Sequence, residues 1–210
     1  SRIATGRDWS LREVVRSWQF WILLAGVLFG NYSLQTHTVV MVPYFEDIGF
    51  SSGTAASALA VYGLCSIGMR FAWGALADRQ GVRVAIITQS LLSAVGAVLL
   101  LQVGGIVSLY IVIAYQGLTM SGFPPLQILV WPAFYGRMHI GSIVGMTQFF
   151  STMAGAAGPV VEGILFDSTG SYVSTLIMLI FTWASCAAIM LALRPQRDVG
   201  ADATLAAAAT

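Results

Sequence analysis

The sequence has very few charged residues, and none of them is lysine. Only 9% of the 210 residues are charged, whereas about 25% of the residues in a soluble domain are. Residues 84–136 carry no charge at all. With 57% hydrophobic residues and a mean hydropathy of +0.80, the composition excludes a water-soluble globule and a disordered chain. It predicts an integral membrane protein embedded in a lipid bilayer.

Net charge and cysteine content exclude further classes of protein. A formal net charge of +1 provides no basic face, so we expect no nucleic-acid partner. Cys65 and Cys186 both fall in apolar segments, where a free thiol behaves as a small hydrophobic side chain. We therefore expect no disulfide, no metal site and no cofactor. No cationic and apolar leader opens the sequence, so we expect no signal peptide and interpret the chain as a fragment.

Six apolar runs are long enough to cross a bilayer, which takes about 20 helical residues. They lie at residues 18–44, 54–73, 84–103, 106–131, 141–165 and 172–193. The expected fold is therefore an all-α membrane protein with six transmembrane helices.

The arginines are distributed unevenly over the connections between these runs. They precede the first run and follow the second, fourth and sixth, at Arg2, Arg7, Arg12, Arg16, Arg79, Arg83, Arg137, Arg194 and Arg197. By the positive-inside rule, both termini are expected in the cytoplasm, and the expected location is the cytoplasmic or plasma membrane.

The segments outside the six-helix unit are expected to be short. We interpret residues 1–16 as a cytoplasmic segment, residues 17–194 as the six-helix unit and residues 195–210 as a disordered tail. Ser10 followed by Glu13 has the spacing of a capping box, which predicts a short helix before the first span.

The sequence contains an internal repeat with an offset of 89 residues. The pattern G-x-L-x-D-x-x-G occurs from Gly74 to Gly81 and again from Gly163 to Gly170. Each copy follows the second helix of a group of three spans, yet the expected topology places the two copies on opposite sides of the membrane. The repeat therefore predicts two inverted three-helix units, which are typical of secondary transporters.

The first copy of the pattern resembles a known motif. Residues 74–83, GALADRQGVR, are similar to the loop signature of the major facilitator superfamily. The resemblance implies that this chain is the C-terminal half of a twelve-helix transporter, whose missing N-terminal half of six helices is a partner of this one. The substrate would then be held between the two halves.

The resemblance also assigns a role to the loop. In the family this loop is a latch that stabilises one state of the transport cycle, and the matching gating residues here are Gly74, Asp78, Arg79, Gly81 and Arg83. A carboxylate at Asp78 can meet a helix N-terminus or Arg83. A charged turn that only sets topology is the alternative.

Four segments are similar to the oxalate/formate and monocarboxylate branch of the superfamily, at residues 37–51, 69–79, 135–145 and 158–172. In that branch an arginine at the position of Arg70 binds the substrate carboxylate, which implies an organic-anion substrate. Two departures from the pattern of this branch stand against dicarboxylate exchange and against a direct copy of its proton mechanism. Ser66 occupies the position where proton-coupled carriers have an acidic residue, and the fifth span lacks the lysine of the oxalate pattern.

Arg70 is the most informative single residue. It lies eight residues before Asp78, about 12 Å of helix, and an intramembrane cation usually faces a cavity and has a partner. Ser66, one turn earlier, lies on the same helix face, which predicts a polar stripe. A guanidinium is well shaped to bind a carboxylate. An arginine that snorkels to the cytoplasmic surface, or that pairs with a carboxylate of the other half, is the alternative.

Two titratable residues are candidates for proton coupling. Glu162 is the only carboxylate within a span, and a buried, unpaired Glu can carry a proton. Because Asp167 is five residues away, a solvated Glu near the membrane surface is the alternative. His37 in the first span can titrate near neutral pH or serve as a packed side chain.

Uncharged polar residues in the first and fifth spans are candidates for substrate contacts. Asn31, Gln35 and Gln148 join Arg70 and Ser66 in this set, because polar stripes can line a water-filled path. Interhelical hydrogen bonds are their alternative role.

These features together predict a secondary transporter of a small solute, such as a monocarboxylate, that works by alternating access. A major facilitator carrier for a non-anionic solute or a drug is the alternative within this class, and a non-transporting half is another. An intramembrane protease would need Ser in a G-x-S-G context, but Thr119 occupies the glycine position before Ser121. We therefore expect no enzymatic activity.

Overall fold

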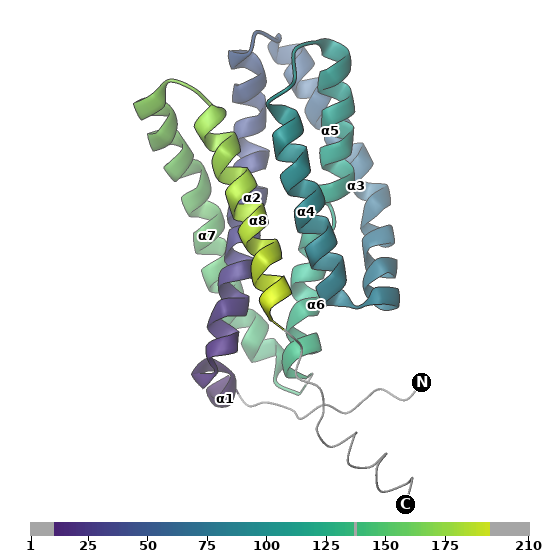
Figure 1. The fold of residues 1–210 in the computed structure, drawn as a ribbon, viewed down its shortest axis with the longest axis vertical. Coiled ribbons are helices and arrows are strands. Elements are labelled where there is room, and N and C mark those ends of the chain that lie inside the picture. The colour runs from purple at the N-terminus through teal and green to yellow at the C-terminus, as the bar shows by residue number, and fades with distance from the viewer. Residues whose placement is uncertain (1–10, 137, 194–210) are drawn as a thin grey trace, which may run out of the picture.

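The computed structural model describes residues 11–136 and 138–193. Within these ranges the chain forms eight helices and no strand, which confirms the expected all-α fold (Figure 1). The helices are α1 (Leu11–Arg16), α2 (Trp18–Asp47), α3 (Ser52–Gln80), α4 (Val82–Leu100), α5 (Ile106–Met120), α6 (Phe123–Tyr135), α7 (Ile140–Thr169) and α8 (Val173–Ala192).

The short helix expected before the first span is α1. Its Val14 is fully buried, and the carbonyl of Val15 accepts a hydrogen bond from Trp21 Nε1 at 2.9 Å. Ser10 of the expected capping box lies outside the described residues, as do Arg137 and the expected tail at residues 195–210.

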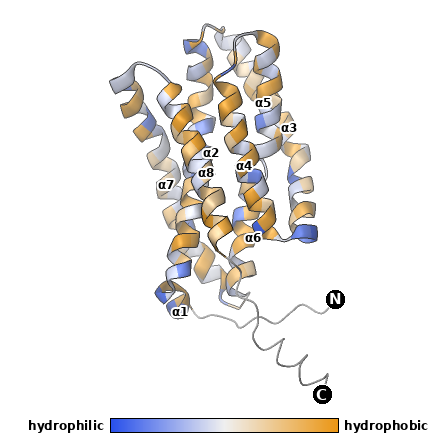
Figure 2. Cartoon of the chain, viewed as in Figure 1, coloured by the Kyte–Doolittle hydropathy of each residue, from blue (hydrophilic) through white to orange (hydrophobic). Residues whose placement is uncertain are grey.

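Five helical segments in the described part of the chain have the length and hydropathy of a membrane span, whereas we expected six. They are α3, α4, α5 continued by α6, α7 and α8. The exception is α2, which at 30 residues is long enough but is interrupted by Asn31, Gln35 and His37. Asn31 and His37 are buried within the bundle, so much of this polarity is directed inward. Figure 2 shows that hydrophobic residues predominate along the long helices.

The fourth expected span is divided into two helices. Residues 106–131 were predicted as one run, but α5 ends at Met120 and α6 begins at Phe123. Pro124 and Pro125 lack the N–H that a helix interior requires, so they occupy the first turn of α6. Gly122 at the break lies against the indole of Trp73, where a Cβ would be 2.6 Å from the ring.

The offset of 89 residues relates the helices themselves. Adding 89 to the bounds of α2, α3 and α4 gives residues 107–136, 141–169 and 171–189, which closely match α5 with α6, α7 and α8. Gly81 and Gly170 are equivalent in the repeat, and both have a positive φ, 91° and 65°. This backbone conformation ends the preceding helix and is favourable only for glycine.

The contacts between helices follow the same symmetry. α2 packs on α7 and α8, while its counterparts α5 and α6 pack on α3 and α4. α4 packs on α8, its own counterpart, in the middle of the bundle. α3 and α7 therefore lie on opposite flanks (Figure 1). This exchange of equivalent contacts confirms the two inverted three-helix repeats.

The close approach of α3 to α5 at Gly117 is testable. A Cβ at Gly117 would lie 2.6 Å from the carbonyl oxygen of Tyr62, so the backbone would have to shift. We expect Gly117→Ala to lower the free energy of unfolding by about 1–3 kcal/mol, as overpacking does, measured by thermal unfolding in detergent. The control is Gly63→Ala, where a Cβ meets nothing within 4 Å and the better helix propensity of alanine should prevent any loss. Equal unfolding midpoints would contradict this packing.

Candidate functional site

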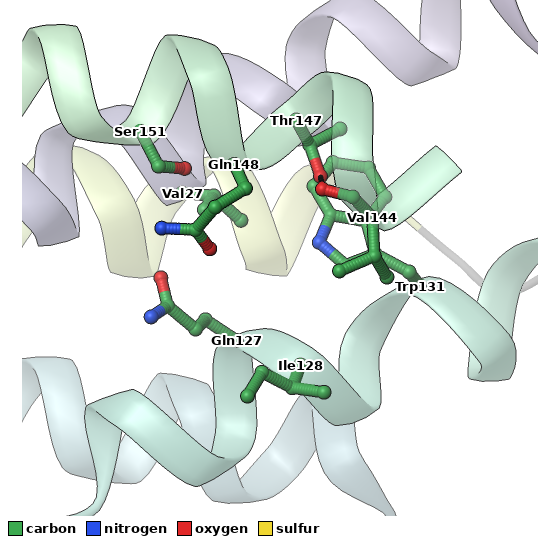
Figure 3. A pocket seen from close by; sticks show the side chains of 8 residues that line it. All are labelled: Val27, Gln127, Ile128, Trp131, Val144, Thr147, Gln148 and Ser151. Atoms are coloured by element: carbon green, nitrogen blue, oxygen red, sulfur yellow. Dashed lines mark hydrogen bonds between the residues drawn. The ribbon is translucent and has the colours of Figure 1, made fainter. Parts of the chain in front are cut away.

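A small polar pocket lies between α2, α6 and α7. Eight side chains line it, those of Val27, Gln127, Ile128, Trp131, Val144, Thr147, Gln148 and Ser151. Figure 3 shows Gln127 of α6 and Gln148 of α7 projecting toward each other across it. Asn31 Nδ2 donates to Gln127 Oε1 at 2.6 Å and to the carbonyl of Val27 at 3.0 Å. The pocket therefore contains neutral groups, and α2 fixes the orientation of one of its amides.

The lining of this pocket combines hydrogen-bonding amides with apolar side chains. Each glutamine amide both donates and accepts hydrogen bonds, and Trp131 offers an apolar wall. Binding sites in membrane bundles are commonly built this way, with a few polar groups among apolar ones. Gln127 was not among the candidates predicted from the sequence, although it is a polar residue inside the charge-free run at residues 84–136.

The predicted polar residues of α2 and α7 lie along one border between these helices. Gln35 is exposed, and its Cγ would be 2.9 Å from a Cβ placed on Gly155 of α7. Gln148 is also exposed, in the pocket described above, and Asn31 lies one turn before Gln35. The structure thus brings Asn31, Gln35 and Gln148 to one region.

The expected polar stripe on α3 is wrong. Arg70 is exposed and points out of the six-helix unit, but Ser66 is buried against α5. The Ser66 hydroxyl is within hydrogen-bond distance of the carbonyls of Tyr62, at 2.7 Å, and Gly117, at 3.2 Å. The short side chain of Ser66 forms hydrogen bonds with the backbone of α3 and α5, whereas the longer side chain of Arg70 extends beyond the interface of these helices.

α6 connects the surroundings of Arg70 with the amide pocket. It packs against both α3 and α7. The residue before it, Gly122, rests on Trp73, which follows Arg70 by three residues on α3. Gln127 lies one turn into α6. The guanidinium and the amides are therefore carried by elements in direct contact.

The expected loop after α3 is a single residue, Gly81, because Asp78 and Arg79 belong to the last turn of α3 and Arg83 to the first turn of α4. The first turn of α4 is anchored to α8. Arg83 donates from Nε to the carbonyl of Met190 at 2.8 Å and from a terminal nitrogen to the carbonyl of Leu191 at 2.7 Å. The last carbonyls of a helix have no intrahelical donor, so this cation caps α8 and matches its dipole. Asp78 and Arg79 are exposed. A helix N-terminus and Arg83 were the two expected partners of Asp78, and the hydrogen bonds of Arg83 go to the carbonyls of α8.

The two candidates for proton coupling are both buried. Glu162 is 1% exposed, so its interpretation as a solvated surface residue is wrong. The Tyr32 hydroxyl donates to Glu162 Oε1 at 2.7 Å, while Oε2 has no partner. His37 is 2% exposed, its ring lies 5.7 Å from that of Tyr62, and its Nε2 has no partner. These two groups lie on different sides of α2.

Comparison with known proteins identifies the family. The family model of the Major Facilitator Superfamily matches residues 20–209. The chain belongs to the Major Facilitator Superfamily. No curated protein matches it. This major facilitator chain is thus an integral, multi-pass membrane protein of the secondary transporter type. Its described residues contain no group of three His, Cys, Asp or Glu side chains that could hold a metal ion.

The role of Arg83 in this major facilitator chain is testable by stability. We expect Arg83→Ala to lower the free energy of unfolding by about 1–3 kcal/mol, because it removes two charge-assisted hydrogen bonds from a helix end. The free energy of unfolding of Arg83→Lys should lie between those of Arg83→Ala and the unaltered protein, since an ammonium lacks the fork that reaches two carbonyls. Thermal unfolding in detergent measures the effect, with the exposed Arg79→Ala as control. If both alanine variants unfold at the same temperature, the capping role is refuted.

Proposed function

We propose that this chain is one half of a transporter that moves a small organic anion, with a monocarboxylate as the favoured substrate. The observation that supports this is Arg70, a cation within a membrane-length helix whose side chain is exposed on the outside of the six-helix unit. A charge at this depth is costly next to lipid. A second six-helix half and a water-filled cavity would cover it, and a carboxylate would pair with it.

The amide pocket supports the same proposal. Its lining carries no formal charge, so the combined region would offer one cation from Arg70 and neutral hydrogen-bonding groups from Gln127 and Gln148. A monocarboxylate with a hydroxyl or carbonyl group matches this combination. A dicarboxylate would place its second charge among neutral groups.

The proposed mechanism is alternating access. The two halves pivot about a site near the middle of the membrane, and the binding of the anion changes the populations of the two states. Arg70 attracts the anion. The turn between α3 and α4, which has Asp78 before it and Arg83 after it bound to α8, biases the equilibrium between the states.

Arg70→Lys tests the anion proposal. Lysine keeps the charge but loses the two-pronged contact with a carboxylate, so we expect the affinity for the transported anion to fall about tenfold, or about 1.4 kcal/mol. Counterflow of lactate, formate and oxalate in proteoliposomes with the complete transporter measures this. The control is Arg79→Lys in the exposed last turn of α3. Unchanged affinity in Arg70→Lys would argue against the anion and in favour of a neutral solute or a drug.

Asp78→Asn tests the role of the loop. The substitution removes a charge without changing the size of the side chain, so insertion and expression should be unchanged while the rate of transport falls. Uptake rates, normalised to the amount of protein in the membrane, measure this. A variant that transports at the unaltered rate would leave the loop with a topological role only.

A further inference from the structure

One carboxylate differs from the others in the described part of the chain. Glu162 is 1% exposed and lies on the side of α7 that packs against α2. The remaining described carboxylates are all exposed, namely Glu13, Glu46, Asp47, Asp78 and Asp167. An ionisable side chain inside a membrane bundle is costly and often marks the path of a proton or an ion.

The contact between Glu162 and α2 is incomplete. The Tyr32 hydroxyl donates to Oε1 at 2.7 Å, but Oε2 is buried without a partner. Thr36, one turn further along α2, also has a buried hydroxyl without a partner, and it lies directly against Gly158, one turn before Glu162. Two unsatisfied oxygen atoms are thus enclosed at the same helix interface, where each costs free energy.

In the part of the chain that the structure describes, the helices around this carboxylate carry no cation that would compensate its charge. The helices that pack on α7 are α2, α6 and α8. Neither these three helices nor α7 itself contains an Arg or a Lys. The titratable group that faces Glu162 is Tyr32. The other titratable groups of these helices and of the loop before α8 are directed elsewhere or lie near helix ends: His37, Tyr44, Glu46, Asp47, Tyr135, Asp167, Tyr172 and Cys186. A proton can neutralise this carboxylate where no cation is available.

The internal repeat provides a comparison for this position. Subtracting 89 from 162 gives Trp73, which fills the equivalent contact between α3 and the junction of α5 and α6. Its Nε1 donates to the carbonyl of Leu118 at 2.8 Å. At the equivalent position of the first repeat, the helices therefore pack through an aromatic side chain whose N–H group has an acceptor. The carboxylate at Glu162 is not needed for the helix contact itself.

α7 is weakened at the same level. Pro159 lies three residues before Glu162 and has no N–H, so the carbonyl of Gly155 loses its helical donor. Gly155 and Gly158 are the positions where side chains of α2 rest on the α7 backbone. A proline next to small residues is a common place for a transmembrane helix to bend.

We propose that Glu162 binds the proton that couples to transport, and that Tyr32 links its protonation to the packing of α7 on α2. The proton taken from water adds to Oε2 and forms a neutral carboxyl group, while Tyr32 continues to donate to Oε1. Release returns the proton to water and leaves a carboxylate that requires hydration, which separates α7 from α2 near Pro159. The inference rests on the proposed transport function, because the proton is taken to drive that transport.

The transport test uses Glu162→Gln in proteoliposomes with the complete transporter. Glutamine keeps the size and an acceptor for Tyr32 but cannot exchange a proton. Lactate uptake driven by a pH gradient should be lost, while lactate counterflow is retained. Asp167→Asn, which removes an exposed carboxylate of the same helix, is the matched control and should keep both activities. The inference would be overturned if Glu162→Gln still showed lactate uptake driven by a pH gradient. It would also be overturned if a sodium gradient, rather than a pH gradient, drove lactate uptake by the unaltered transporter.

Infrared difference spectroscopy between acid and alkaline pH tests the proton site without a substrate. The complete transporter should show a carboxyl C=O band that is lost in Glu162→Gln and shifted in Tyr32→Phe, which removes one hydrogen bond. If the unaltered protein lacks this band, the inference is overturned, even when Glu162→Gln fails to fold. If the band is present but no tested anion is transported, the anion proposal fails and the proton site stands.

Discussion

The packing of α4 on α8 is the contact on which the rest of the bundle depends, because it joins the two inverted repeats at equivalent helices. Lipid provides no hydrophobic reason for helices to associate, so van der Waals packing and interhelical hydrogen bonds must hold them together. At this contact the Ser90 hydroxyl lies 3.4 Å from Cys186 Sγ, and Trp183 of α8 is fully buried. With α4 and α8 joined, α2 packs on α8 and α5 on α4, which leaves α3 and α7 on the flanks.

The position of α3 and α7 on the flanks explains why the functional candidates lie on them. A flanking helix has one face against the bundle and another that remains open. Arg70 uses the open face of α3, while Glu162 uses the packed face of α7. The connections between the second and third helices of the two repeats also differ in their contacts. Arg83 caps α8, whereas its equivalent, Tyr172, stacks on Phe166 with ring centroids 4.3 Å apart. The repeat therefore duplicates the architecture but not the chemistry.

Much of this architecture could be predicted from the sequence, because hydrophobic length and glycine patterns are local signals. The 89-residue offset predicted the inverted repeats before any contact was known. The break before α6 was missed, although Pro124 and Pro125 signal it. The surroundings of the candidate residues could not be predicted, since they depend on pairs distant in the chain. The Tyr32 bond to Glu162 spans 130 positions, and only the packing of α7 on α2 reveals that this carboxylate is buried.

The two flanks are held by contacts of different kinds, and this difference bears on how the bundle can change shape. On the α3 flank, Gly117 lies against a backbone carbonyl and the Trp73 donor is satisfied, so sliding α3 would break complete contacts. On the α7 flank, the helix contains Pro159, and the oxygens Thr36 Oγ1 and Glu162 Oε2 have no partner. Opening this interface gives up one interhelical hydrogen bond and hydrates two unsatisfied atoms, which offsets part of the cost. The unsatisfied atoms and the buried carboxylate therefore lie on the same flank, where hydration can compensate for part of the contact that opening removes.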